Sequence, residues 1–373
     1  MLKVGFGLGF LAKGLQRNHV DGIGVYSQEL YRALLSENLQ LLPYIYGQND
    51  LKDFPDAYSL HPSFLKHIFE CEVLKKKIEC LNTDFKPQLI HATDHLIPRV
   101  KNIPVVATVM DLIPFIHPEW TNSRLRTLKN YLFRKTILSA DHIITISEYS
   151  KKDLMQYLDI PEEKISVTYL GVNPAFYDKI SEKDKQKVLQ KLNIHSDFFL
   201  FVGTLQARKN LEAALDAHAL LSFEEQCACP FVIVGNAGWA STNLLQKIQK
   251  GEEQGVVKWL KFLPNHEVKC LLQSALALVY VSLYEGFGLP ILEAFASGCP
   301  VITSNVTSIP EVAGDAAIMV NPRNIYQIKE AMKGLIDSVN LRKDLQKKGL
   351  KLAMSMSWEN CAKKTKEVYE FLV

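Results

Sequence analysis

Two glutamates lie close together in the stretch from Ser282 to Pro300, with seven residues between Glu285 and Glu293. An apolar run typical of a buried strand precedes the first glutamate. Pro290, followed by apolar residues at helical spacing, predicts a helix that carries the second. A helix N-terminus presents unpaired N–H groups and partial positive charge, which suit phosphate or sugar oxygens. The stretch therefore predicts a strand, a glycine turn and a helix that together bind a ligand of this kind.

Each part of this stretch has an expected role. Glu285 ends the strand and faces the ligand, whereas Glu293, in the first helical turn, can accept two hydrogen bonds from a vicinal diol such as a ribose. The backbone N–H groups expected to hold sugar and phosphate belong to the turn residues Gly286, Phe287, Gly288 and Leu289. An ordinary helix start with a solvated Glu285 fits the same spacing, so the spacing alone leaves both interpretations open.

A pair of cations follows another predicted strand, Phe198 to Val202. The loop begins with Gly203 and Thr204 and places Arg208 beside Lys209, just before a predicted helix. A guanidinium next to an ammonium is the pairing expected for a diphosphate. A basic solvated loop explains the local sequence equally well.

The N-terminal half offers weaker candidates. Gly22 and Gly24 form a Gly-x-Gly between a predicted strand, Val4 to Leu8, and a predicted helix, so they either approach a phosphate or merely allow a tight turn. Asp111 ends another predicted strand, Ile103 to Met110. Because ligands of open α/β sheets bind beyond the carboxyl ends of strands, a cleft is expected to be lined by His91, Thr93, Asp94, Met110 and Asp111.

The remaining elements follow the same strand–helix alternation. A glycine-bearing loop is expected after the first strand, and helices and loops are expected over residues 51–85. With 373 residues, of which 47% are hydrophobic, the chain is long enough for two globular domains. The predicted fold is therefore α/β, with two domains.

Composition narrows the possible partners. The formal net charge of +3 does not indicate a nucleic-acid partner, and no run of about 18 apolar residues indicates a membrane span. Seven cysteines, an odd number, fit reduced thiols in the cytoplasm better than a disulfide framework. Two basic segments, Lys75 to Lys77 and Arg124 to Leu138, either face an anionic membrane or acceptor or form solvated surfaces.

The segments EGFGLPILEAFASGCPVI and SIPEVAGDAAIMVNP resemble the signature of family 4 of the retaining glycosyltransferases. The segments GTLQARKN and ADHIITISEYS resemble other parts of the same family, and the resemblance covers nearly the whole chain. It implies the GT-B fold, in which two Rossmann-like, doubly wound domains face a central cleft and a C-terminal helix crosses back to the N-terminal domain. The implied domains are 1–172 with 357–373, and 173–356.

The resemblance also implies roles for the candidate residues. Arg208 and Lys209 would stabilise the leaving diphosphate, Glu285 the transferred sugar, and Glu293 the ribose, while Asp111 would lie near the reacting groups. The nucleobase would lie near Phe262 and Leu263. The implied reaction retains the anomeric configuration. No metal or other cofactor is expected, because the sequence lacks Asp-x-Asp and contains the cationic pair.

Segments such as HATDHLIP and DLIPFIHPEW resemble bacterial mannosyltransferases of surface-polysaccharide synthesis. They favour GDP-mannose as the donor and a glycan or lipid-linked acceptor at the inner face of the membrane. A transferase that uses UDP-glucose or another UDP-hexose is the alternative, followed by a UDP-sugar 2-epimerase and an inactive nucleotide-sugar-binding subunit. Met110 stands where the family usually has a histidine that contacts the transferred sugar, which leaves that contact and the sugar undecided.

Overall fold

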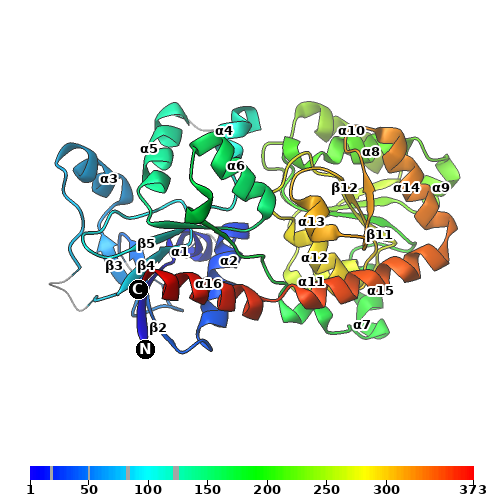
Figure 1. Ribbon diagram of the computed structural model, residues 1–373. Helices are drawn as coiled ribbons and strands as arrows, with labels where there is room; N and C mark the ends of the chain where they lie inside the picture. The colour runs from blue at the N-terminus through cyan, green and yellow to red at the C-terminus, as the bar shows by residue number, and fades with distance from the viewer. Residues whose placement is uncertain (17–19, 49–50, 81–84, 121–125) are drawn as a thin grey trace. The chain divides into compact units, whose positions relative to one another are not determined.

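The computed structural model describes residues 1–373 except 17–19, 49–50, 81–84 and 121–125. It divides the chain into an N-terminal unit, Met1–Gly171 with Trp358–Val373, and a C-terminal unit, Val172–Ser357 (Figure 1). These limits lie one residue from the domain limits expected from the sequence. The predicted basic segment from Arg124 to Leu138 falls partly outside the described residues.

The described part of the N-terminal unit forms a seven-stranded parallel sheet in the order β3-β2-β1-β4-β5-β6-β7. Its strands are β1 (Leu2–Gly7), β2 (Leu39–Tyr46), β3 (Tyr58–His61), β4 (Leu89–Ala92), β5 (Val105–Thr108), β6 (His142–Thr145) and β7 (Ile165–Val167). Its helices are α1 (Gly9–Gln16), α2 (Gly22–Leu34), α3 (Phe64–Val73), α4 (Ile113–Ile116), α5 (Arg126–Leu138), α6 (Glu148–Leu158) and α16 (Trp358–Leu372). Every residue of β4, β5 and β6 is buried, as parallel strands covered on both faces require.

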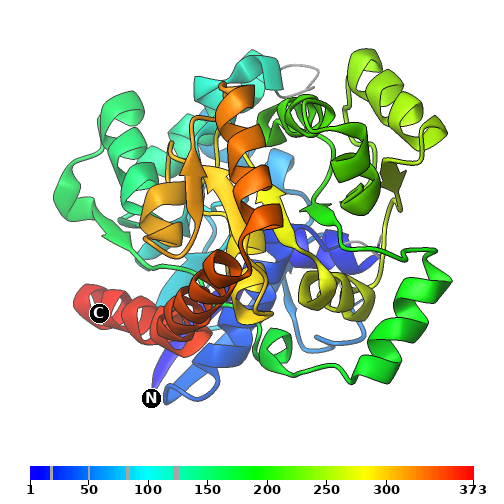
Figure 2. The ribbon, with the colours of Figure 1, turned by 90° about the vertical axis from the view of Figure 1, so that its right-hand side faces the viewer.

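The C-terminal unit repeats this architecture with a six-stranded parallel sheet, ordered β10-β9-β8-β11-β12-β13. Its strands are β8 (Phe199–Val202), β9 (Phe231–Val234), β10 (Val257–Trp259), β11 (Ala277–Tyr280), β12 (Val301–Ser304) and β13 (Ile318–Val320). Its helices are α7 (Glu182–Lys191), α8 (Leu211–Ala219), α9 (Phe223–Ala228), α10 (Thr242–Glu253), α11 (Asn265–Ser274), α12 (Leu289–Ala296), α13 (Ile309–Ala313), α14 (Ile325–Asp337) and α15 (Val339–Ser355). Figure 2 faces this unit and shows helices on both sides of its strands.

The strand order fixes where each unit can bind a ligand. In both sheets the chain builds outward from a first strand in one direction and later returns to build in the other. The order reverses between β1 and β4 in the N-terminal unit and between β8 and β11 in the C-terminal unit. Open α/β sheets bind ligands beyond the carboxyl ends of the strands at such a switch point.

The last helix belongs to the N-terminal unit, although it follows the C-terminal unit in sequence. In α16, the Tyr369 hydroxyl lies 2.6 Å from Nδ1 of His91 on β4. Trp358, at the start of α16, packs near Tyr26 of α2. The predicted doubly wound architecture with a returning C-terminal helix is therefore confirmed.

Two local predictions in the N-terminal half were wrong. The residues after β1 form helix α1 rather than a loop, because Leu8, Leu11 and Ala12 recur at helical spacing and are buried. The polar stretch 51–85 contains strand β3 as well as helix α3, because Tyr58–His61 pairs with the edge of β2. An edge strand of four residues gives too short an alternating pattern to be recognised in the sequence.

Candidate functional site

The switch point of the C-terminal unit brings together two loops that are distant in sequence. The turn Ala207–Lys209 follows β8, whereas Glu285 follows β11, and these two strands are neighbours in the sheet. The backbone of the two loops is joined directly, because the Leu283 N–H donates to the Arg208 carbonyl at 2.7 Å. The two sequence motifs with the clearest chemistry therefore form one site.

Glu285 is the centre of this site. Its Oε2 lies 2.7 Å from Nη1 of Arg208, and its Oε1 lies 2.9 Å from Nζ of Lys209. Oε1 also accepts hydrogen bonds from the hydroxyls of Tyr280, at 2.8 Å, and Ser282, at 2.9 Å. Glu285 and Lys209 are both buried, so the carboxylate bridges two cations in a largely dry environment.

Burial and ion pairing act in opposite directions on these groups. Burial raises the pKa of Glu285, but the charges of Arg208 and Lys209 lower it by more than burial raises it. The resulting pKa is about 2, so the carboxylate stays ionised. Burial lowers the pKa of Lys209 to about 8, and the nearby Glu285 opposes that shift. The Lys209 ammonium also lies 4.5 Å from the centre of the Tyr280 ring and contacts the Tyr280 hydroxyl. Together the three charged groups carry one net positive charge beside the strand ends.

A second set of hydrogen bonds holds the loops in place. Asn210, in the left-handed conformation after the cation turn, donates to the carbonyls of Val281 at 3.0 Å and Pro322 at 2.7 Å. The Ser308 hydroxyl donates to the Glu285 carbonyl at 2.7 Å, and the Glu285 N–H donates to Thr307 at 3.3 Å. The site is therefore positioned by rigid strand ends and by backbone contacts.

Gly203 and Gly235 explain why the loop after β8 runs close to the loop after β9. Both have φ of +147°, and a Cβ added to Gly235 would lie 2.0 Å from the Gly203 carbonyl oxygen. Only glycine permits this approach. Gly203 and Thr204, which begin the predicted cation loop, thus lie where two backbone segments approach closely at the carboxyl edge of the sheet.

The glycine turn leads into α12 as expected, with Gly288 at φ +110° and Pro290 as the second helical residue. Glu293, however, is the fifth residue of α12, so its placement in the first helical turn was wrong. The helix begins at Leu289, one residue before the proline used to locate its start. Burial raises the pKa of the half-buried Glu293 to about 7, and the Lys209 charge opposes that rise.

The remaining turn residues lie in the same stretch. Phe287 is buried, and its carbonyl lies 3.4 Å from the Ser308 hydroxyl that donates to Glu285. Gly286 is buried and Leu289 is half-buried. Phe262 and Leu263, the residues expected near the nucleobase, lie in the loop between β10 and α11. The Phe262 ring is 56% exposed, so it offers a flat surface at the same edge of the sheet.

In the N-terminal unit, the predicted glycines lie at the start of α2. The Asp21 carboxylate accepts a hydrogen bond from the Gly24 N–H at 2.9 Å and so already caps this helix. A Cβ at Gly24 would meet the Val20 side chain at 2.6 Å, whereas Gly22 faces open space. Tight packing against Val20 therefore explains why residue 24 is glycine.

Two of the other N-terminal candidates are structural. His91 is fully buried and lies between Tyr369 and the Thr108 hydroxyl, which is 2.8 Å from its Nε2. Thr93 is also fully buried and donates to the Gly7 carbonyl at 2.7 Å. The expectation that His91 and Thr93 line a cleft was therefore wrong, because both side chains are used in holding the sheet to its helices.

The carboxyl ends of β4 and β5 carry two aspartates that bind backbone N–H groups. Asp94 accepts hydrogen bonds from the N–H groups of Phe10, at 2.8 Å, and Leu96, at 2.7 Å. Asp111 is partly exposed and accepts one from Ile113 at 3.1 Å. His95, which the sequence did not single out, lies near both, and burial lowers its pKa although the Asp111 charge opposes that shift. A histidine therefore lies at this edge even though Met110 occupies the expected position.

The sequence also missed Tyr280, Ser282 and Asn210 around Glu285. Tyr280 and Ser282 belong to or follow a predicted strand, where their polar groups gave no separate signal. Among the residues that the structure describes, no group of three or more His, Cys, Asp or Glu side chains could hold a metal ion. Within that same part of the chain, no helix is both long and apolar enough to cross a membrane.

The two doubly wound units, with this site at a switch point, define a protein of the GT-B class of glycosyltransferases. The chain matches two family models: Glycosyltransferase Family 4 over residues 20–176 and Glycosyl transferases group 1 over residues 182–352. It is 30% identical, over 95% of its length and 97% of that protein, to the O-antigen chain mannosyltransferase B of Escherichia coli. The chain belongs to glycosyltransferase family 4 and is a glycosyltransferase.

A second relative and a solved structure extend this comparison. The O-antigen chain mannosyltransferase RfbU of Salmonella typhimurium is 29% identical over 66% of this chain and 65% of that protein. The crystal structure of Anabaena HepE in complex with UDP-glucose is 15% identical, covers 100% of both chains, and gives a TM-score of 0.75. This structural likeness concerns the fold.

Proposed function

We propose that the chain transfers mannose from GDP-mannose to a glycan or glycolipid acceptor, with retention of configuration and without a metal. The two mannosyltransferase relatives support the sugar. The bridge from Glu285 to Arg208 and Lys209 is the single observation that carries the chemistry. A diphosphate leaving group needs positive charge in a dry site, and these two buried or half-buried cations supply it.

The residues have distinct roles in this proposal. Arg208 and Lys209 hold the diphosphate and stabilise the charge that develops as the sugar–phosphate bond breaks. Glu285 orients the Lys209 ammonium, contacts the sugar hydroxyls and stabilises the oxocarbenium-like transition state. Glu293 binds the ribose, and N–H groups of the turn from Gly286 to Leu289 hold sugar and phosphate. Phe262 and Leu263 lie beside the base.

The acceptor belongs to the N-terminal unit in this proposal. Asp111 is partly exposed at the carboxyl end of β5, where it can bind an acceptor hydroxyl. Because the enzymes named above build O-antigen chains, we propose a glycan or lipid-linked acceptor and peripheral contact with the inner face of a membrane. The leaving phosphate accepts the proton of the attacking hydroxyl, so the reaction needs no second carboxylate as a nucleophile.

The test is release of GDP from GDP-mannose with a panel of mannose-containing glycan acceptors, with UDP-glucose as the comparison donor and EDTA in parallel reactions. The proposal predicts acceptor-dependent GDP release in EDTA and an α-linked product from the α-linked donor, identified by NMR. Selective turnover of UDP-glucose would reassign the donor. Release of an epimerised free sugar, or donor binding without turnover, would contradict the transferase.

A further inference from the structure

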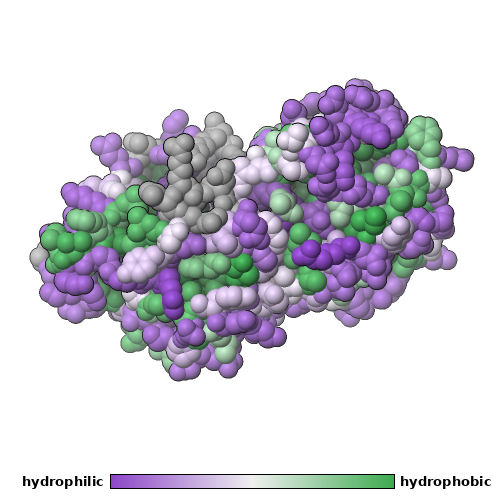
Figure 3. All heavy atoms as spheres, turned by 90° about the horizontal axis from the view of Figure 1, so that it is seen from above, coloured by the Kyte–Doolittle hydropathy of each residue, from purple (hydrophilic) through white to green (hydrophobic). Residues whose placement is uncertain are grey.

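Helix α3 carries a row of large apolar side chains that face solvent. Leu65, Phe69 and Val73 recur every four residues on one face, and their exposed fractions are 68%, 61% and 58%. Leu74, directly after the helix, is 63% exposed. Figure 3 shows hydrophobic surface at the end of the molecule where α3 lies. We call these four residues the α3 stripe.

The α3 stripe has no function in the core of the N-terminal unit. The opposite face of the helix packs inward through His67, Ile68 and Cys71, which are all buried. Isolated apolar residues on a surface need no explanation, but three large ones on one helix face, with a fourth directly after the helix, indicate an interaction surface. The helix therefore has one face for the fold and another for a partner.

Positive charge borders the stripe. Lys75, Lys76 and Lys77 follow it, and none of their ammonium groups forms an ion pair with a carboxylate in the part of the chain that the structure describes. Nearby acids already have cationic partners, since Glu72 binds two and Glu79 lies 2.9 Å from the Lys101 ammonium. The three lysines thus leave a net positive surface next to the stripe.

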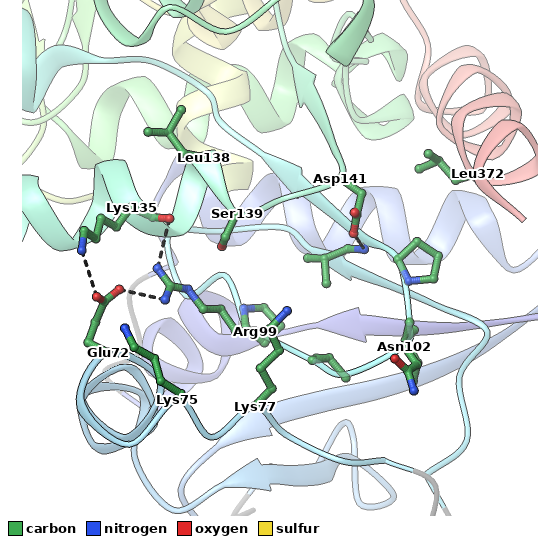
Figure 4. Close-up of a pocket in the computed structure, with 15 residues that line it drawn as sticks. Glu72, Lys75, Lys77, Arg99, Asn102, Lys135, Leu138, Ser139, Asp141 and Leu372 are labelled. Carbon is green, nitrogen blue, oxygen red and sulfur yellow. Dashed lines mark hydrogen bonds and ion pairs between the residues drawn. The ribbon is translucent and has the colours of Figure 1, made fainter.

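A basic pocket of about 820 Å³ opens beside the same lysines (Figure 4). Lys75 and Lys77 line it together with Arg99, Lys135 and Ser139. It lies where β5 and β6 begin, so it is at the opposite edge of the N-terminal sheet from Asp94 and Asp111, which follow the carboxyl ends of β4 and β5. A pocket of this size suits a small ligand or headgroup.

The acidic groups of this pocket are already used. Glu72 lies 2.8 Å from Nη1 of Arg99 and 2.9 Å from Nζ of Lys135, as the dashed lines in Figure 4 show. Asp141 accepts a hydrogen bond from the Val105 N–H at 2.8 Å. Among the described residues that line the pocket, the charged side chains without an ion pair or hydrogen bond of this kind are therefore Lys75 and Lys77, and both are cationic.

We propose that the α3 stripe and the three lysines form a docking surface for a bilayer that contains anionic phospholipid, with a phosphate-bearing headgroup in the adjoining pocket. An amphipathic helix with apolar residues on one face and lysines at its border lies in the plane of a membrane interface. Clustered lysines bind anionic lipid surfaces through charge. Both features occur on neighbouring parts of a single unit, and the net charge there is positive.

The inference names a surface for the membrane contact proposed above, but its test needs neither donor nor acceptor. The full chain is floated with phosphatidylcholine vesicles, or with vesicles in which phosphatidylglycerol replaces roughly one third of the lipid. We expect binding to the anionic vesicles and little to the neutral ones. Equal binding to both kinds, or to neither, would overturn the inference while leaving the transferase proposal intact.

The contribution of the three lysines to vesicle binding is tested with charge-reversal variants. Replacing Lys75, Lys76 and Lys77 by Glu should weaken binding to anionic vesicles by about 100-fold or more, since each lysine contributes roughly fivefold. The matched control replaces Lys343, Lys347 and Lys351, three exposed lysines of α15, by Glu and should bind like the wild type. Equal losses in the two triple variants would show a general charge effect and overturn the inference.

The apolar contribution is tested with Phe69→Ser and Val73→Ser together, which should lower vesicle binding roughly tenfold or more. Phe223→Ser, at a 63% exposed phenylalanine of the C-terminal unit, is the control.

Ser139→Trp fills the pocket without changing charge and should reduce the preference for anionic vesicles; an unchanged preference would contradict the headgroup placement. A Phe69-dependent dimer in sedimentation, without vesicle binding, would assign the stripe to a second copy of the chain and overturn the inference.

Discussion

The switch points of the two units have the same topology and different chemistry. Between β8 and β11, a buried carboxylate bridges Arg208 and Lys209. Between β1 and β4, the buried carboxylate of Asp94 accepts backbone N–H groups instead, and Phe10 lies beside the His95 ring. One site is therefore built around side-chain cations, and the other around an acid, a histidine and an aromatic ring.

This difference shows that the loops, rather than the shared sheet, decide which ligand each unit can bind. A phosphorylated donor needs the cations of the C-terminal unit. A hydroxylated acceptor suits the carboxylates of the N-terminal unit, where a diphosphate would meet Asp21 and Asp94. The comparison predicts that mutations in one switch point affect the donor, whereas mutations in the other affect the acceptor.

The largest effect is expected from Glu285→Gln. Loss of the carboxylate removes the group that orients Lys209 and contacts the sugar, so kcat should fall by about 10²- to 10³-fold. Steady-state kinetics of GDP release measure this. Glu330→Gln makes the same change at an exposed position of α14 and should leave kcat unchanged. Normal turnover in Glu285→Gln would remove this residue from the mechanism.

Arg208→Gln should have the next largest effect, with kcat/KM lower by about 10²-fold. The variant loses one of the two protein cations that are proposed to stabilise the leaving diphosphate. Donor saturation kinetics report it, and Lys261→Gln, in the loop after β10, is the control. If both variants lost activity equally, the general positive charge of the unit, rather than the switch point, would be responsible.

Asp111→Asn, after the strand next to the N-terminal switch point, tests the other half of the comparison. It should raise the KM for the acceptor roughly tenfold, the scale of one lost charged hydrogen bond, and leave the Kd for the donor unchanged. Acceptor titration and donor calorimetry together separate the two quantities. A higher Kd for the donor with an unchanged KM for the acceptor would contradict the assignment of acceptor binding to the N-terminal unit.

The smallest effect concerns Glu293 and pH. Its pKa in the folded chain is about 7, above the ordinary value, so the folded state retains a proton that the unfolded state releases. This contribution to stability is complete below about pH 4.5 and is lost as pH rises through 7. Glu293→Gln does not titrate, so its free energy of unfolding should rise by roughly 2 kcal/mol relative to that of the wild type as the pH is raised from 5 to 8. Urea unfolding measures both free energies. A constant difference across this range would contradict the shift.

Sequence patterns predicted the strands that are buried on both faces, because apolar runs such as Val105–Thr108 or Ala277–Tyr280 have few alternatives. They missed β3, whose identity depends on pairing with β2, and they misplaced Glu293 within α12. The pairing of Glu285 with Arg208 was not visible either, since 77 residues separate them and only the neighbouring positions of β8 and β11 join them. His91 was expected to line a cleft because the local sequence does not reveal its burial. That burial depends on Tyr369 of α16, the last helix of the chain.

The most direct test of the central claim is calorimetry of GDP-mannose, GDP and UDP-glucose binding in EDTA, with the wild type and with Lys209→Met. Methionine keeps the length and apolar stem of the lysine but removes its charge. The account predicts that the wild type binds GDP-mannose and GDP in EDTA, and that Lys209→Met weakens both at least tenfold. Unchanged affinity in Lys209→Met, or binding that requires a divalent metal, would contradict a donor site built on the cations beside Glu285.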